Sequence, residues 1–380
     1  MKIAINCIFY RPKGGGIAEY IYNLVNNLEK VDKENEYLLY VLEDWVELAQ
    51  QHLPQRFRIK AVPYGNSGFI NVVRRSIFIQ RFWTAEEALE KFDLFHSPFF
   101  HSPFFKNAKV VVTVHDLRFF RFPATYPLPR YLYLRTAVRR SVKSADHVIA
   151  ISKFTKSELM DAYTLPDHQI SVVLEAISSQ RFSEQQISDF VLPAQWQMLA
   201  DANFILTVGH LEPRKNYERL IEAFKQMKAE GKADGTKLVI VGQKMHHYKH
   251  VLQLISEDEN ILWLNFVEHK LLLWLYKNAR LFIFPSFYEG FGFPPLEAGC
   301  FGTVSAVSNV SSMPEVCGNA VQYFDPYNVE EMASSMSQLL HDHARQEELR
   351  SLMYHRIQEL SWEENARQTL AIYNKVIASS

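Results

Sequence analysis

The sequence has little cysteine and no long apolar segment. Its three cysteines, Cys7, Cys300 and Cys317, are far apart and form no C-x-x-C pair, so neither a disulfide framework nor a zinc site is expected. No uninterrupted apolar stretch of roughly 18 residues occurs, which argues against a transmembrane helix. Residues 1–9 form a short strand-like run without the longer apolar region of a signal peptide. We therefore expect a cytoplasmic protein.

Net charge is also small. The formal charge of −1 argues against a general nucleic-acid binder, so nucleic acid is not an expected partner. The charge is uneven along the chain, because residues 1–177 hold 23 Lys and Arg against 18 Asp and Glu, and the remainder holds 18 against 24. The amino-terminal half is the expected face for an acidic partner or an anionic membrane.

Two ligand-binding motifs are missing. The sequence contains no Asp-x-Asp triplet, a motif whose two carboxylates can hold a divalent metal ion. It also has no G-x-G-x-x-G within residues 13–20, after the first apolar run, which weakens the reading as an NAD-dependent oxidoreductase. We therefore expect neither a metal nor another cofactor.

The length and the apolar pattern predict an α/β fold. A chain of 380 residues with 48% hydrophobic content is long enough for two packed domains. Apolar strand candidates alternate with helical stretches in both halves, which predicts two doubly wound parallel sheets. We expect domains at 1–177 and 178–361. The expected strands are 2–9, 37–42, 57–62, 92–96, 109–114, 146–151, 170–173, 204–208, 237–241, 261–264, 280–284, 303–306 and 321–324.

The segment 286–297 places a glycine-rich turn and two glutamates after an apolar strand. Its two prolines suit the first turn of a helix, which puts Glu297 on that helix and Glu289 before it. Gly290 and Gly292 let the backbone approach a ligand closely, and the amides at a helix start favour a diphosphate. The alternative is that Glu289 is a solvated loop residue and Glu297 complements the helix dipole.

A second turn of the same kind lies at 209–216, after the strand candidate 204–208. It begins with Gly209 and carries Arg214 and Lys215 beyond the carboxyl end of the strand, where open parallel sheets bind ligands. Arg214 and Lys215 are therefore candidates to contact a ligand at this edge. The alternative, a solvated pair at a helix start, is unfavourable for the helix dipole.

Two features of the amino-terminal half also predict ligand contacts. Gly15 and Gly16 follow the first strand and precede a run with helical spacing, so a helix start faces the ligand site unless the glycines are merely a flexible turn. His115 follows the buried run 110–114, and its side chain is expected at the ligand cleft, although an isolated histidine is more often structural. Asp116 could cap the next turn or meet an acceptor.

Together these motifs resemble the retaining glycosyltransferases of family 4. The resemblance rests on Gly-x-Leu-x-x-x-Lys at 209–215, Glu-Gly-Phe-Gly at 289–292 and the second glutamate eight residues after the first. It is supported by the order and spacing of four further motifs and covers nearly the whole chain. It implies the GT-B fold, in which two Rossmann-like domains face each other across a cleft. It also implies that the final helix, within 362–380, packs back onto the first domain.

The resemblance also implies roles for the candidate residues. Glu297 would accept hydrogen bonds from the ribose, and Glu289 would contact hydroxyls of the donated sugar. The amides around Phe291 and Gly292 would hold the sugar or phosphate. Gly14 to Gly16 would close over the diphosphate, and His115 would contact the donor sugar. The implied catalytic set is His115, Arg214, Lys215 and Glu289, and the implied donor-binding set adds Gly15, Gly16, Gly209, Gly290, Phe291, Gly292 and Glu297.

The chain departs from the common family pattern at His210, where many members have arginine. Arg214 would then supply the missing charge. Glu315 resembles an acidic residue of a family loop, but it could equally cap the following turn.

An acceptor surface is suggested by residues 118–143, which contain seven Lys or Arg and no acid. This basic stretch, together with aromatic residues, fits a lipid-linked acceptor and peripheral contact with the inner face of the plasma membrane. Ordinary core packing with basic residues facing water explains it equally well. The further residues of this reading are Ile70, Arg74, Arg75, Phe78, Arg81, Phe82 and Trp83.

The leading hypothesis is a retaining enzyme that moves a hexose from a UDP- or GDP-sugar to a saccharide or lipid-linked acceptor in bacterial polysaccharide or lipopolysaccharide synthesis. No residue suggests a covalent nucleophile, which favours front-face displacement without a metal. A UDP-sugar 2-epimerase, which would use the same architecture, remains the alternative.

Overall fold

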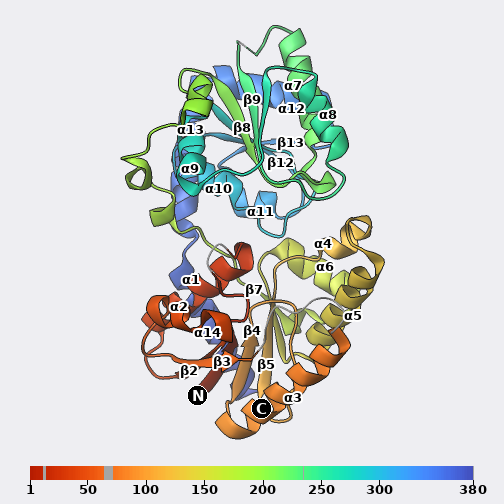
Figure 1. Ribbon diagram of the computed structural model, residues 1–380, viewed down its shortest axis with the longest axis vertical. Helices are drawn as coiled ribbons and strands as arrows, with labels where there is room; N and C mark the ends of the chain where they lie inside the picture. Colours follow the sequence, from red (N-terminus) through yellow and green to blue (C-terminus); the bar gives the residue numbers. More distant parts are fainter. Residues whose placement is uncertain (12–13, 64–71, 234, 380) are drawn as a thin grey trace. The chain divides into compact units, whose positions relative to one another are not determined.

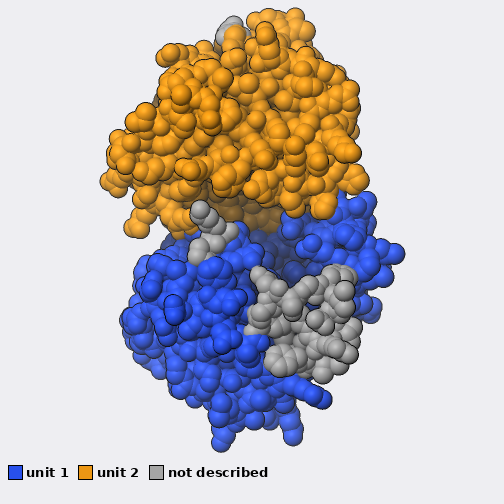
Figure 2. All heavy atoms as spheres, viewed as in Figure 1, with its two compact units in different colours: residues 1–176, 361–380 blue, residues 177–360 orange. Residues whose placement is uncertain are grey.

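The computed structural model describes residues 1–11, 14–63, 72–233 and 235–379. The chain divides into two compact units. The first contains Met1–Ala176 and Ser361–Ser380, and the second contains Ile177–Leu360 (Figure 2). The chain therefore leaves the first unit after Ala176 and returns to it at Ser361.

The first unit is built on a seven-stranded parallel sheet with the strand order β3-β2-β1-β4-β5-β6-β7 (Figure 1). Its strands are β1 (Lys2–Asn6), β2 (Glu36–Leu42), β3 (Arg58–Val62), β4 (Leu94–Ser97), β5 (Lys109–Val114), β6 (His147–Ala150) and β7 (Ile170–Val172). All of β4 and β6 is buried, as expected of parallel strands that helices cover on both faces.

Helices flank this sheet on both sides. Along β5, Val110, Val112 and Val114 share a core cluster with Val138 of α5, whereas Thr113, on the opposite face, lies beside Tyr20 of α1. This alternation follows from the two-residue period of a strand. The helices are α1 (Gly16–Val31), α2 (Val46–His52), α3 (Val72–Glu90), α4 (Arg118–Arg121), α5 (Leu128–Ser144), α6 (Lys153–Tyr163) and α14 (Trp362–Ala378).

The second unit contains a six-stranded parallel sheet with the order β10-β9-β8-β11-β12-β13 (Figure 1). Its strands are β8 (Phe204–Val208), β9 (Lys237–Val241), β10 (Ile261–Leu264), β11 (Leu281–Phe284), β12 (Ser305–Ser308) and β13 (Gln322–Phe324). Its helices are α7 (Tyr217–Ala229), α8 (Lys249–Ser256), α9 (His269–Asn278), α10 (Pro294–Gly299), α11 (Met313–Cys317), α12 (Val329–His341) and α13 (His343–Glu359). Phe224 of α7 and Met336 of α12 belong to one buried cluster with Ile205 and Ile283 of the sheet.

Side chains cap several helices at their first residues. Ser152 accepts a hydrogen bond from the amide of Thr155 at the start of α6, and Ser361 accepts from the amides of Glu363 and Glu364 at the start of α14. Such caps satisfy amides that have no partner within the helix. The cap at Ser361 begins α14 at the point where the chain returns to the first unit, and α14 packs against α1.

The predicted fold class is confirmed, since both units are doubly wound parallel sheets. All predicted strands are present, with differences at their ends. The strand predicted at 2–9 ends at Asn6, because the chain turns where the amide of Tyr10 bonds to the carbonyl of Cys7. The strand predicted at 303–306 instead spans Ser305–Ser308. No helix among the described residues has the length and apolar character to cross a membrane.

Candidate functional site

The candidate site lies where β8 and β11 end. These strands are parallel neighbours, with Leu281 paired to Ile205, so their carboxyl ends share one edge of the sheet. The loops that follow are joined by backbone and side-chain hydrogen bonds. The amide of Phe287 donates to the carbonyl of Arg214 at 2.8 Å, and Asn216 Nδ2 donates to the carbonyl of Pro285 at 3.1 Å.

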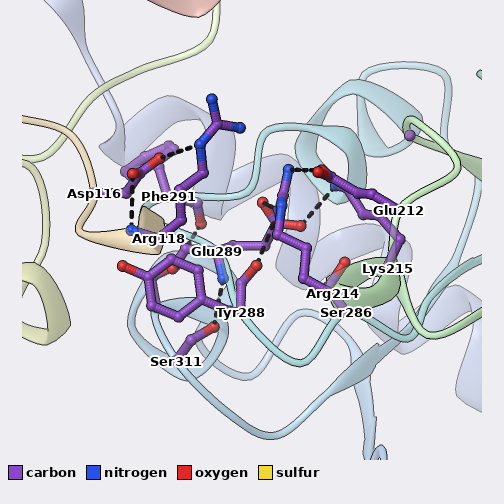
Figure 3. Close-up of polar contacts among 12 residues, drawn as sticks. Asp116, Arg118, Glu212, Arg214, Lys215, Ser286, Tyr288, Glu289, Phe291 and Ser311 are labelled. Carbon is purple, nitrogen blue, oxygen red and sulfur yellow. Dashed lines mark hydrogen bonds and ion pairs between the residues drawn. The ribbon is translucent and has the colours of Figure 1, made fainter. Parts of the chain in front are cut away.

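Four charged side chains from the two loops form an ion-pair cluster (Figure 3). Lys215 Nζ lies 2.6 Å from Glu289 Oε1, and Arg214 Nη1 lies 2.8 Å from Glu289 Oε2. Arg214 Nη2 lies 2.7 Å from Glu212 Oε1. The ion-pair cluster, defined as Glu212, Arg214, Lys215 and Glu289, thus contains two cations and two carboxylates.

The cluster determines the protonation of its central carboxylate. Burial would raise the pKa of Glu289, but the adjacent Arg214 and Lys215 lower it to about 2. Burial lowers the pKa of Lys215, and the carboxylate of Glu289 opposes that effect. Glu289 is therefore an ionised hydrogen-bond acceptor at neutral pH.

Arg214 has the most contacts in the cluster. Besides its two carboxylate partners, its Nη1 donates to the carbonyl of Tyr288 at 3.0 Å. A guanidinium with this set of acceptors fixes the orientation of Glu289 and of the loop that carries it. His210, which follows Gly209, is exposed and belongs to none of the cluster's ion pairs.

The glycines of both loops make room for their neighbours. A Cβ atom on Gly209 would lie 2.8 Å from Lys215 Cε and 3.0 Å from the hydroxyl oxygen of Tyr217. Gly292 has a φ of +95°, and a Cβ there would lie 2.0 Å from the terminal methyl of Met313. A side chain at either position would therefore displace the parts that shape the site.

Two serines hold the glutamate loop from the side of α11. Ser311 Oγ accepts a hydrogen bond from the amide of Glu289 at 3.1 Å. The hydroxyl of Ser312 lies 3.0 Å and 2.8 Å from the carbonyl oxygens of Glu289 and Phe291. The Phe291 side chain is buried and packs against Phe293, so this residue presents its backbone rather than its ring.

Glu297 is oriented by a different partner. It lies on α10, as predicted, and its Oε2 accepts a hydrogen bond of 2.6 Å from the hydroxyl of Tyr276. Tyr276 is a fully buried residue of α9. The second glutamate is therefore fixed from a neighbouring helix, while the first is fixed by the ion-pair cluster.

Sequence reasoning missed Glu212, Tyr276, Ser311 and Ser312. Glu212 could have been found, because it lies two residues before Arg214 in a turn that was already singled out. Tyr276 had no such signal, since it occupies an apolar helical run far from either motif. The serines lie in a turn whose packing beside the glutamate loop depends on the pairing of β11 with β12.

The other predicted site residues, His115, Gly15 and Gly16, belong to the first unit. His115 follows β5, and its ring is 16% exposed. Its Nδ1 lies 2.9 Å from Glu175 Oε1, and its Nε2 lies 2.9 Å from the carbonyl oxygen of Pro98. Gly15 and Gly16 begin α1, whose Tyr20 ring contacts His115 edge-on at a centroid distance of 4.9 Å.

Two further residues have local roles in the structure. Asp116 Oδ1 accepts a hydrogen bond from the amide of Arg118, the first residue of α4, at 3.1 Å (Figure 3). Glu315 lies in the first turn of α11, where an acid is favourable for the helix dipole.

The aromatic part of the predicted acceptor surface needs a correction. Trp83 is 2% exposed and packs against Tyr40 and Phe95 in the core, because its side of α3 covers the sheet. Ile70 lies outside the described residues, as do the side chains of Arg74, Arg75 and Phe78.

Among the described residues, no group of three or more His, Cys, Asp or Glu is arranged to hold a metal ion.

Two family models match the chain. The model for Glycosyltransferase Family 4 matches residues 14–181, and the model for Glycosyl transferases group 1 matches residues 191–356. The O-antigen chain mannosyltransferase B of Escherichia coli is 31% identical over 268 residues, which are 70% of this chain and 70% of that protein.

Solved structures share the fold at low sequence identity. Sucrose-phosphate synthase from Thermosynechococcus elongatus matches with a TM-score of 0.75 and 18% identity, over 100% of both chains. The Anabaena protein HepE in complex with UDP-glucose matches with a TM-score of 0.72 and 16% identity, over 99% of this chain and 100% of that chain.

Proposed function

The chain belongs to glycosyltransferase family 4 and is a hexosyltransferase of the GT-B fold; from this premise we propose that it retains the anomeric configuration of the sugar that it transfers. The proposed donor is a nucleotide diphosphate sugar and the proposed acceptor a saccharide. Mannose is the first candidate for the hexose, since a 31% identical relative is named a mannosyltransferase. GDP-mannose is then the preferred donor. A UDP-glucose-type donor is second, because a fold neighbour was solved with UDP-glucose.

The observation that supports this function most is the ion-pair cluster. It places two cations and an ionised Glu289 at the carboxyl edge of a parallel sheet, where such folds bind ligands. Because its charges balance, an entering diphosphate would compete with Glu289 and Glu212 for the N–H groups of Lys215 and Arg214. The carboxylate of Glu289 would at the same time gain sugar hydroxyls as donors.

We assign the charge stabilisation during transfer to Arg214 and Lys215. Positive groups aimed at a departing diphosphate lower the barrier because they need not reorient as the charge develops. A bound divalent ion would supply the same charge in other transferases, and the proposed reaction does not require one. Glu297, held by Tyr276, would accept hydrogen bonds from the ribose hydroxyls.

The proposed displacement takes place on one face of the sugar. The anomeric carbon loses its bond to the phosphate oxygen and gains a bond to the acceptor oxygen from the same side. The acceptor hydroxyl gives its proton to the departing phosphate. In this scheme no side chain forms a covalent intermediate, and His115 contacts the donor sugar.

A lipid-linked acceptor is the finer proposal, and it rests on the surface of α5. Leu128 is 66% exposed and Leu132 is 49% exposed, beside exposed arginines at 135 and 139. Apolar side chains flanked by cations suit the interface of an anionic membrane. We name the α5 surface as the exposed residues Leu128, Arg130, Leu132, Tyr133, Arg135, Arg139, Arg140 and Lys143.

Other contacts of the α5 surface also combine a cation with an apolar side chain. The Arg140 guanidinium lies 3.8 Å from the centre of the Phe104 ring, and that of Arg130 lies 5.7 Å from the Tyr126 ring. Phe104 is itself exposed. We therefore propose peripheral association of the first unit with the inner face of the plasma membrane.

The deciding experiment is a transfer assay with the full-length protein. GDP-mannose, UDP-glucose and UDP-galactose are each incubated with saccharide and lipid-linked acceptors, with and without EDTA. We expect product from one donor, full activity in EDTA and a retained anomeric configuration by NMR. An inverted product, or strict dependence on magnesium or manganese, would overturn the proposed mechanism.

The 2-epimerase alternative gains no support from the matched relative, which is named a transferase. It predicts that UDP-N-acetylglucosamine alone is converted without any acceptor. The same assay without acceptor separates the two activities.

A further inference from the structure

We propose that Glu175 is a positioning residue that keeps the ring of His115 doubly protonated and fixed in orientation. Glu175 lies in no motif of the sequence, and its carboxylate is 3% exposed. The inference rests on the proposed function, in which His115 meets the donor sugar, and adds a residue that controls the charge His115 carries.

The hydrogen-bond partners of His115 determine its protons. The carbonyl oxygen of Pro98, 2.9 Å from Nε2, can only accept, so Nε2 carries a hydrogen. Glu175 Oε1, 2.9 Å from Nδ1, accepts whenever Glu175 is ionised. A ring between two acceptors has both nitrogens protonated and is an imidazolium.

Because Glu175 is buried, its carboxylate and the imidazolium of His115 stabilise each other. A carboxylate removed from water is costly unless a positive group or several donors replace the solvent. The charged ring of His115 provides that compensation. Burial disfavours the charge on His115, yet the Glu175 carboxylate and the Pro98 carbonyl raise the pKa of the ring above its ordinary value.

The remaining titratable groups around His115 do not compete for the proton. Asp116, on the same loop, is a further negative charge that favours the imidazolium. His96 of β4 is fully buried, and burial with the nearby His115 lowers its pKa to about 3, so it stays neutral. Tyr20 of α1 meets the ring edge-on, and burial holds the pKa of its hydroxyl above the ordinary value.

The backbone on either side of Glu175 is anchored. The carbonyl of Leu174 accepts a hydrogen bond of 2.8 Å from Asn365 Nδ2 on α14, and Ala176 is buried, with 1% of its surface exposed. The carboxylate therefore approaches His115 from a fixed position. Glu175 stays bonded to Nδ1. The Nε2–H group of His115 can therefore exchange the carbonyl oxygen of Pro98 for an oxygen atom of the donor sugar, and the ring keeps its charge.

The direct test is NMR of the donor-free, full-length protein with ¹⁵N-labelled histidine. We expect both ring nitrogens of His115 to be protonated at pH 7 in the wild type. In Glu175→Gln, which keeps the shape but loses the charge, we expect a neutral ring at the same pH. A neutral His115 in the wild type would overturn the proposal without any assay of transfer.

Kinetics provide the second readout. We expect Glu175→Gln to shift the alkaline limb of the kcat/KM profile to lower pH by about one unit or more, and Glu175→Asp to restore part of that shift. The matched control is Glu158→Gln, another buried carboxylate of the first unit that pairs with an arginine, Arg121; its profile should not move. An unmoved profile in Glu175→Gln, with lower activity throughout, would mean a purely structural role and would overturn the proposal.

The outcomes also separate this inference from the proposed function. If His115 is an imidazolium that Glu175→Gln discharges, but His115→Ala transfers sugar normally, then the contact of His115 with the donor is wrong while the pairing holds.

Discussion

Lys215 Nζ lies 2.6 Å from Glu289 Oε1, and the two side chains are 7% and 11% exposed. The ammonium group expected to face the diphosphate is thus held by the carboxylate expected to face the sugar. The two residues are 74 positions apart and meet only because β8 and β11 are neighbours in the sheet. Lys215 therefore helps to position Glu289, and Glu289 helps to position Lys215.

Removing the charge of Lys215 should impair both stability and transfer. In Lys215→Met, Glu289 keeps Arg214 but loses its buried cation partner, so we expect a loss of about 3 kcal/mol in the free energy of unfolding. Transfer should fall by about a hundredfold or more. Urea unfolding and initial rates measure the two effects. Lys225→Met, which breaks the half-exposed pair with Glu257, should change stability by less than about 1 kcal/mol.

The ion-pair cluster also predicts a pH dependence of stability. The pKa of Glu289 falls from 4.5 to about 2 on folding, so its stabilising contribution is present above pH 4.5 and is lost as the pH falls towards 2. Glu289→Gln has no such group. The unfolding midpoint of the wild type should therefore decline more steeply between pH 4.5 and 2 than that of the variant. Parallel declines would show that Glu289 is not held ionised.

The hydroxyl of Tyr276 should matter for nucleotide binding. Tyr276→Phe removes the 2.6 Å hydrogen bond to Glu297 Oε2 and with it one of the contacts that orient the carboxylate. A hydrogen bond to a charged group contributes about 1.5–3 kcal/mol, so nucleoside diphosphate affinity should weaken by about tenfold or more in calorimetric titration. The exposed Tyr354 supplies the control: Tyr354→Phe should bind as the wild type does. Equal affinities in both variants would remove Tyr276 from the site.

A methyl group at Gly209 should displace Lys215. The new Cβ of Gly209→Ala would lie 2.8 Å from Lys215 Cε, and the end of a flexible side chain can move away. We expect a folded protein whose rate of transfer falls by about tenfold or more, as misplacement of a charge-stabilising group predicts. Circular dichroism checks the fold and initial rates check the function. A fully active variant would show that Lys215 acts from another position.

Charge reversal on the α5 surface should release the protein from anionic vesicles. Arg135→Glu combined with Arg139→Glu changes two exposed cations into anions, and each cation near such a surface contributes about 1 kcal/mol to binding. Co-sedimentation with phosphatidylglycerol vesicles should fall by about tenfold or more, and added salt should weaken wild-type binding. Lys225→Glu combined with Lys232→Glu in the second unit should bind normally. Equal loss in both double variants would point to net charge rather than to the α5 surface.

Much of the fold was predictable because buried parallel strands have short, continuous apolar sequences. The run at 204–208 became β8 with the same ends, and the proline-led helix expected after Gly292 became α10. Strand ends were less predictable. The apolar Cys7 continues the hydrophobic pattern of β1 in the sequence, yet the strand ends at Asn6. The amide of Cys7 makes a last hydrogen bond to the carbonyl of Tyr40 at the edge of the sheet.

The sequence by itself determined the two parallel-sheet units and the residue types at the strand ends, because burial period, glycine turns and charged loops are local properties of the chain. Only the tertiary structure decided the partners: Glu289 with Lys215 and Arg214, Glu297 with Tyr276, and His115 with Glu175. These pairs join residues far apart in the chain, and which side chains meet depends on strand order and on burial, which sets the cost of leaving a charge without its counterpart.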